Sequence, residues 1–108
     1  MDKISKNINI AVSCDNQFNN YESFRDNLNN FITEFKKGIS IFTNYKHQLM
    51  SKYIEEYRYT LTMINDNNIS CIDGLLAFWD GNDGKTHDII NYMVDHNKRL
   101  KIVFVKGD

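Results

Sequence analysis

The sequence predicts a single α/β domain built on a small open, mostly parallel five-stranded sheet with helices on both faces. Three observations support this fold class. The chain has 108 residues, which suits one domain. Short apolar segments rich in β-formers alternate with segments whose apolar residues recur at helical spacing. Hydrophobic residues make up 42% and charged residues 25% of the chain, as in globular and not disordered proteins.

The first strand and helix are predicted near the N-terminus. Residues Ile8–Cys14 are apolar and partly β-branched, which predicts a buried strand, and Asp and Asn residues in the next segment favour a turn. From Tyr21 the apolar residues recur every three or four positions, which predicts an amphipathic helix. Lys36 and Lys37 suit the C-terminal end of this helix, and Gly38 suits its C′ position.

A second strand and helix follow over Ile39–Thr43 and from Leu49 to Tyr57. Residues Tyr59–Ile64 alternate and are rich in β-formers, which favours a third strand, although a longer second helix also fits their spacing. The stretch Asn65–Asn68 is a polar loop. Aromatic residues at helical spacing are expected in the core. They are Phe24, Phe31, Phe35, Tyr53 and Tyr57.

The last two strands enclose a glycine-rich turn and a third helix. Residues Gly74–Trp79 form an almost continuous apolar run, as expected of a central strand buried on both faces. The turn DGNDG over residues 80–84 leads into a helix from Lys85 to about Asn97, and Lys101–Val105 forms the last strand. The apolar residues near the chain end, Phe104 and Val105, suit an edge strand that pairs with a second copy.

This alternation favours a Rossmann-like sheet with the strand order 3-2-1-4-5, because parallel crossovers are right-handed. The order places a switch point between the first and fourth strands. Ligands of such sheets bind there, beyond the carboxyl ends of the strands. The loops expected around the site are Cys14–Asn20, Thr43–Lys46 and Asp80–His87.

Composition excludes several functional classes. The net charge of −1 disfavours bulk binding of nucleic acid. The sequence contains neither an apolar run of about 20 residues nor a signal-peptide pattern, so we expect a cytoplasmic protein that does not enter membranes. Cys14 and Cys71 suit free thiols, and His47, His87 and His96 lack metal-ligand spacing, so neither a metal nor a cofactor is expected. The absence of proline and the abundance of Asn, Ile, Lys and Tyr indicate an AT-rich source genome.

The segment DGLLAFWDGNDGKTHDII, Asp73–Ile90, resembles the C-terminal signature of a small Rossmann-like family in the SLOG superfamily. The pattern of that family is roughly D-x-x-x-A-F-W-D-G-x-S-x-G-T-x-x-x-I. The first strand, turn and helix have a similar layout to the N-terminus of the family. The residues in register with the signature are Asp73, Ala77, Phe78, Trp79, Asp80, Gly81, Thr86 and Ile90.

The chain departs from the family pattern at its phosphate-binding positions. Residues 43–47 replace a glycine-rich second loop, and Asn65–Ser70 replaces a longer stretch after the third strand. Lys85 stands where the family has Gly, and Asp83 where it has Ser. The resemblance implies a reduced member of a superfamily that is associated with nucleotides and nucleotide-derived signals, and some of whose members cleave N-glycosidic bonds.

The turn Asp80–Thr86 is the strongest candidate site, because a helix N-terminus attracts anions and Lys85 adds a positive charge. The alternative is an ordinary turn that Asp83 or Thr86 caps. A P-loop is excluded, because Trp79 stands where its first Gly belongs. The predicted ligand-binding residues are Cys14, Asp15, Asn16, Thr43, Asn44, Tyr45, Trp79, Asp80, Gly81, Asn82, Asp83, Gly84, Lys85 and Thr86.

Several of these residues have competing interpretations. Trp79 either stacks on a nucleobase or belongs to the core. Asp15 either accepts from a ribose hydroxyl or acts as a base, or it only caps a turn. Lys46 and His47, beside Tyr45, are further candidates for ligand contact. No spacing supports a catalytic pair of Cys14 with a histidine.

The leading hypothesis is non-catalytic binding of a nucleotide-derived small molecule. From the AT-rich composition and the family resemblance, the chain suits a phage protein that sequesters a nucleotide immune signal of its host, in the host cytoplasm. The second hypothesis is a nucleoside or nucleotide N-glycosidase in which Asp15 or Asp80 assists the leaving base. The third is a protein inhibitor of a host enzyme. A homo-oligomer is expected, because small domains often complete a site at a subunit interface.

Overall fold

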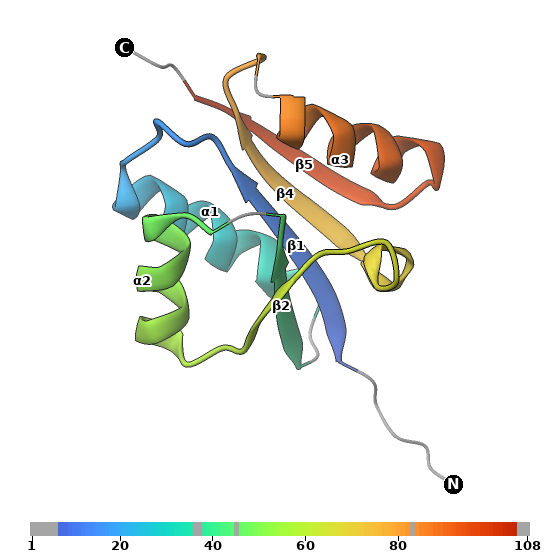
Figure 1. Ribbon diagram of the computed structural model, residues 1–108. Helices are drawn as coiled ribbons and strands as arrows, with labels where there is room; N and C mark the ends of the chain where they lie inside the picture. The colour runs from blue at the N-terminus through green and yellow to red at the C-terminus, as the bar shows by residue number, and fades with distance from the viewer. Residues whose placement is uncertain (1–6, 36–37, 45, 83, 106–108) are drawn as a thin grey trace, which may run out of the picture.

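The computed structural model describes residues 7–35, 38–44, 46–82 and 84–105 and shows a five-stranded, all-parallel sheet with the order β3-β2-β1-β4-β5 (Figure 1). The predicted Rossmann-like fold class and strand order are therefore confirmed. The elements are β1 (Ile8–Cys14), α1 (Tyr21–Thr33), β2 (Ile39–Thr43), α2 (Gln48–Tyr57), β3 (Leu61–Met63), the 3₁₀ turn η1 (Ile69–Cys71), β4 (Gly74–Trp79), α3 (Gly84–Asp95) and β5 (Arg99–Phe104).

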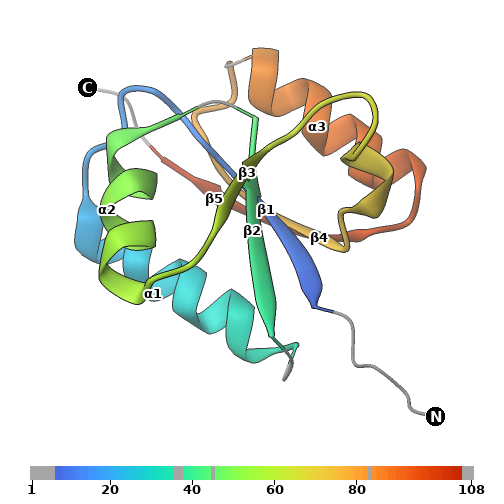
Figure 2. The same cartoon turned by 60° about the horizontal axis from the view of Figure 1, so that its bottom comes forward.

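The sheet separates two layers of helices. Figure 2 shows α1 and α2 on one side and α3 with η1 on the other. Because side chains alternate along a strand, Ile10 and Val12 of β1 pack toward α1 and α2, whereas Ala11 packs toward α3. The central strands β1 and β4 therefore contribute to two separate apolar cores.

The helices cover the two faces of the sheet unequally. The connections from β1 to β2 and from β2 to β3 each contain a full helix, of 13 and 10 residues. On the other face α3 has 12 residues, but the connection from β3 to β4 contains only the three-residue η1. An Asn-rich turn precedes η1, in which Asn65 Oδ1 accepts from the backbone N–H groups of Asn67 and Asn68. The predicted polar loop is thus confirmed, and one helix-sized space on this face is only partly filled.

The boundaries of the strands differ less from the predictions than those of the helices. The third strand is confirmed against the longer-helix alternative, because α2 ends at Tyr57 and Arg58 takes a left-handed conformation with φ 61°. Strand β3 is shorter than predicted, at three residues. Strand β5 begins two residues earlier than predicted, and α3 ends two residues earlier, before His96, which is exposed.

Two predictions about α1 and the core are wrong. The helix ends at Thr33, because the N–H groups of Glu34 and Phe35 bond carbonyls only three residues back, as in a tightened last turn. Gly38 therefore does not cap the helix, and the predicted positions of residues 36 and 37 lie outside the described residues. Tyr57 is 39% exposed, whereas Tyr53 is fully buried.

None of the helices within the described ranges has both the length and the apolar character that a bilayer span requires.

Candidate functional site

The loops after β1, β2 and β4 meet at the carboxyl edge of the sheet, as the strand order predicts. The backbone N–H of Asp15 donates to the carbonyl of Phe78 at 2.7 Å, which holds the start of the first loop against the end of β4. The hydroxyl of Thr43 donates to the carbonyl of Val12 at 2.8 Å. Both Asp15 and Thr43 are buried, so these contacts position the loops beneath the surface.

His47 joins the first and second loops. Its Nδ1 accepts from the N–H of Leu49 at 3.0 Å, which caps α2, and its Nε2 lies 3.0 Å from the carbonyl oxygen of Asp15. Because Nδ1 is the acceptor, Nε2 carries the proton and donates to that carbonyl. Both ring nitrogens of this buried histidine thus have backbone partners, and the ring serves as a structural link.

Ser13 and Thr86 link β1 to α3 on the opposite face. Their hydroxyl oxygens lie 2.7 Å apart, and both residues are fully buried. Thr86 was predicted to contact ligand, but in this structure its side chain lies under the surface, in the first turn of α3. Cys14 is also buried, and its thiol donates to the carbonyl of Asp15 at 3.6 Å.

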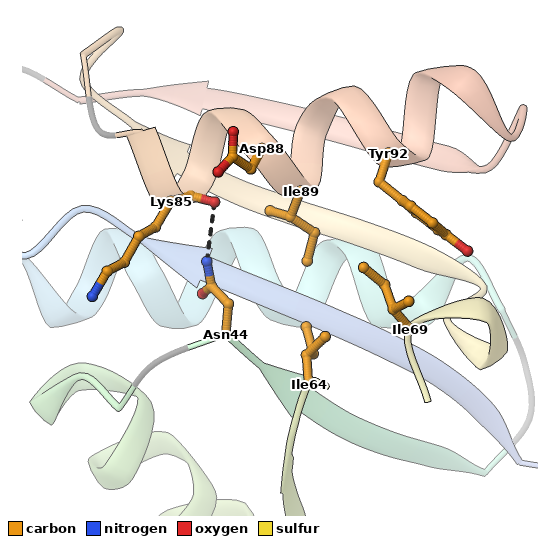
Figure 3. Close-up of a pocket in the computed structure, with 7 residues that line it drawn as sticks. All are labelled: Asn44, Ile64, Ile69, Lys85, Asp88, Ile89 and Tyr92. Carbon is orange, nitrogen blue, oxygen red and sulfur yellow. Dashed lines mark hydrogen bonds between the residues drawn. The ribbon is translucent and has the colours of Figure 1, made fainter. Parts of the chain in front are cut away.

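Asn44 connects the second loop with the start of α3. Its Nδ2 donates to the carbonyl of Lys85 at 3.3 Å, and Figure 3 shows this bond across one end of a cavity. Its Oδ1 is buried and has no hydrogen-bond partner among the described residues. A buried acceptor without a donor costs about 1–3 kcal/mol, and because this oxygen is closed to solvent, the cost falls on the fold itself.

The turn after β4 is open to solvent. Asp80 Oδ1 accepts from the N–H of Asn82 at 2.8 Å, and Gly81 takes a φ of 93° that side chains rarely adopt. Gly84 begins α3. Neither cavity described below is lined by these four residues. The predicted contacts of Tyr45 and Asp83 lie outside the described residues.

Trp79 is half-buried and belongs to an aromatic cluster on the α3 face. Its ring stacks on His87 with centroids 5.5 Å apart and lies 6.1 Å from the ring of Phe104. Trp79 also packs against the core beneath α3. The structure therefore places this ring on the α3 face of the sheet, beside His87 and Phe104 of β5.

Two cavities lie at this edge, on opposite faces of the sheet. A polar cavity of about 280 Å³ lies between the loop after β1 and the start of α2. An apolar cavity of about 330 Å³ lies between α3 and the β3–β4 connection. The residues that line the polar cavity are Asn16, Phe18, Asn19, Lys46, His47 and Gln48. Those that line the apolar cavity are Asn44, Ile64, Ile69, Lys85, Asp88, Ile89 and Tyr92.

Sequence reasoning named Asn16, Asn44 and Lys85 as ligand contacts, and it offered Lys46 and His47 as further candidates. It placed Phe18 and Asn19 only within a loop expected around the site, and it missed the other lining residues. The signal for the apolar cavity was the short stretch Asn65–Ser70, which is too short for a face-covering helix. Among the described residues no group of three or more potential metal ligands lies together.

The fold and the cavities together define a small Rossmann-like α/β protein with a polar cavity at the carboxyl edge of its sheet. Comparisons of the chain with protein-family models, with curated proteins and with solved structures found no significant match. The resemblance to the SLOG superfamily therefore stays a prediction from the residues of the signature.

Proposed function

We propose that this protein binds an anionic, nucleotide-derived small molecule at the carboxyl edge of its sheet, without converting it. The observation that carries the proposal is the polar cavity between the loop after β1 and the N-terminus of α2. In parallel α/β sheets ligands bind beyond the carboxyl ends of the strands, where this cavity lies.

The lining of the polar cavity suits an anion that also offers hydrogen-bonding groups. Lys46 is exposed and supplies a positive charge, and no carboxylate is among the described lining residues. Asn16, Asn19 and Gln48 each supply a carboxamide, which both donates and accepts. These groups match a phosphate or a ribose. At about 280 Å³ the cavity is just below the size of typical small-molecule pockets, so it accommodates one portion of a nucleotide.

The surroundings of the potential catalytic residues favour binding over catalysis. His47 uses both ring nitrogens for backbone contacts, so neither serves as a base. The thiol of Cys14 is buried against the Asp15 carbonyl. Efficient acid–base catalysis requires a titratable group within reach of the reacting atom, and these two side chains do not provide one.

Calorimetric titration with the four nucleoside 5′-monophosphates and with cyclic dinucleotides tests this proposal. Cyclic dinucleotides represent the nucleotide immune signals that the family resemblance suggests. We expect saturable binding of at least one of these compounds, weakened about tenfold by Lys46→Gln through loss of a charge-assisted contact. Lys52→Gln, on α2 but outside the cavity lining, removes the same charge and should leave the affinity unchanged.

Chromatography of the titrated samples separates binding from turnover. Intact nucleotide after long incubation supports a binding protein. If free base is released, and if Asp15→Asn or Asp80→Asn abolishes that release, the protein is an N-glycosidase and the proposal of binding without conversion is wrong. If no compound of the panel binds at millimolar concentration, the proposal of a nucleotide-binding protein is wrong.

A further inference from the structure

We infer that the polar cavity encloses the nucleobase of the ligand, stacked on Phe18, while the phosphate of the same molecule lies at the mouth beside Lys46. This inference rests on the proposed function and deepens it, because it names the part of the nucleotide that the cavity holds. Phe18 then separates nucleotides from other phosphate esters.

The residues that line the polar cavity differ in exposure. Phe18 is half-buried and His47 is buried, whereas Asn16, Asn19, Lys46 and Gln48 are exposed. The two least exposed lining residues thus form the floor, and both of them carry aromatic rings. The polar and charged groups form the rim. A phosphate suits this rim, whereas a flat aromatic ring suits the floor.

The imidazole of His47 has no hydrogen-bonding atom left for a ligand. Its Nε2 donates to the carbonyl of Asp15 and its Nδ1 accepts from the N–H of Leu49, each at 3.0 Å. The ring therefore offers a ligand only its carbon atoms and its π-face. Such a surface favours an apolar planar group and gives nothing to an anion.

The ring of Phe18 is held in place from below. It stacks on Phe78, with centroids 5.4 Å apart and planes inclined by 14°, and Phe78 in turn stacks on Phe24 at 4.9 Å. The N–H of Phe18 also donates to the Asp15 carbonyl at 3.1 Å. Among the described residues no ring besides Phe78 stacks on Phe18. The phenyl ring is therefore a fixed platform on which a base of any kind can stack.

The rim supplies the contacts that the rest of a nucleotide requires. Lys46 provides a positive charge for the phosphate. The carboxamides of Asn16, Asn19 and Gln48 both donate and accept, which suits ribose hydroxyls and the edge of a base. Base and phosphate thus meet different residues, Phe18 and Lys46, so their contributions to affinity can be removed separately.

Three related ligands separate these contributions. Calorimetry compares the tightest-binding nucleoside 5′-monophosphate of the four with its nucleoside and with ribose 5-phosphate. We expect the nucleotide to bind at least tenfold more tightly than ribose 5-phosphate. Phe18→Leu should weaken the nucleotide and the nucleoside about tenfold and leave ribose 5-phosphate unchanged. Lys46→Gln should weaken the nucleotide and ribose 5-phosphate and leave the nucleoside unchanged.

Two control variants and one measurement on the wild type accompany this test. Phe18→Tyr keeps an aromatic ring and should keep the preference for the nucleotide. Phe104→Leu removes a ring that is 70% exposed and lies outside the lining, and it should change none of the affinities. Melting curves identify the folded variants. If Phe18→Leu does not fold, nuclear Overhauser contacts between base protons and the Phe18 ring in the wild type decide the question.

Equal affinities for the nucleotide and ribose 5-phosphate would overturn the inference and leave anion binding beside Lys46 in place. A preference that persists in folded Phe18→Leu, or the lack of contacts between the base and Phe18, would also overturn it. If a cyclic dinucleotide binds and no monophosphate does, the proposed function stands and this inference is wrong. If no compound binds, both are wrong.

Discussion

The hydroxyl groups of Ser13 and Thr86 form a buried polar contact between the central strand β1 and the first turn of α3. Buried polar groups are costly unless they are paired, so this contact fixes how α3 approaches the sheet. The sequence offered Thr86 as a ligand contact or as a helix cap, and Ser13 was not singled out. Ser13 offered a signal, because it is a polar residue inside an otherwise apolar predicted strand.

We expect Ser13→Ala to lower the free energy of unfolding by about 1–2 kcal/mol, because it removes the 2.7 Å partner of the Thr86 hydroxyl. The double variant Ser13→Ala/Thr86→Val should cost less than the sum of the two single variants, since it removes both members of the pair. Urea unfolding measures all three. Ser51→Ala, on the exposed face of α2, is the control and should change stability by less than about 0.5 kcal/mol. Strict additivity would show that the two hydroxyls do not interact.

Among the secondary-structure elements, two helices are followed by residues whose backbone is strained in the left-handed conformation. Helix α2 ends at Arg58 with φ 61°, and Asn97, after α3, has φ 55°. A left-handed conformation costs a residue with a Cβ about 1–2 kcal/mol, whereas Gly adopts it freely and Asn tolerates it. Arg58 is therefore the more strained of the two positions.

Arg58→Gly should raise the free energy of unfolding by roughly 0.5–1 kcal/mol, because relief of the left-handed strain exceeds the added entropy of the unfolded chain. Asn97→Gly should raise the free energy of unfolding by a smaller amount, because Asn already tolerates the left-handed conformation. Thermal unfolding of both variants gives the comparison. Arg58→Ala keeps the Cβ and should show no such gain, so an equal gain for alanine would attribute the effect to the lost charge instead of the backbone.

The predicted elements differ in accuracy for physical reasons. The bounds of β1, β2 and β4 were predicted correctly, because these inner parallel strands are mostly buried and read as short, largely apolar segments between polar turns. The end of α1 was not, because Phe35 continues the helical spacing while it packs against the core from outside the helix. Periodicity reports which side chains are buried, and it does not report where the backbone stops being helical.

The candidate site, too, was predicted only in part from the sequence. Strand order alone predicted which loops converge, and the contacts of Asp15 with Phe78 and of Asn44 with Lys85 agree with it. The cavities could not be predicted, because each depends on side chains from elements that are distant in sequence. Among the described residues of the predicted turn after β4, only Lys85 lines a cavity.

For the whole molecule, the sheet leaves two unequal edges. Strand β3 offers only three residues at one edge, whereas β5 offers six at the other and pairs with β4 alone among the described strands. Such an edge is a template for pairing with another chain, and proteins usually protect it with charges, bulges or a short strand. Arg99 and Lys101 provide charge at the start of β5, but Phe104 near its end is 70% exposed.

We expect two copies to associate along β5, with Phe104 at the contact, because this pairing satisfies the outer backbone groups and covers the exposed ring. Sedimentation velocity over a wide concentration range should show a reversible shift from monomer to dimer. Phe104→Lys should keep the protein monomeric at every concentration, whereas Met63→Lys at the opposite edge should leave association unchanged. Met63 is a suitable control, since it is an exposed apolar residue of the other edge strand, at 40%. A wild-type protein that is monomeric throughout the range would exclude this mode of assembly and leave both cavities to be completed by one chain.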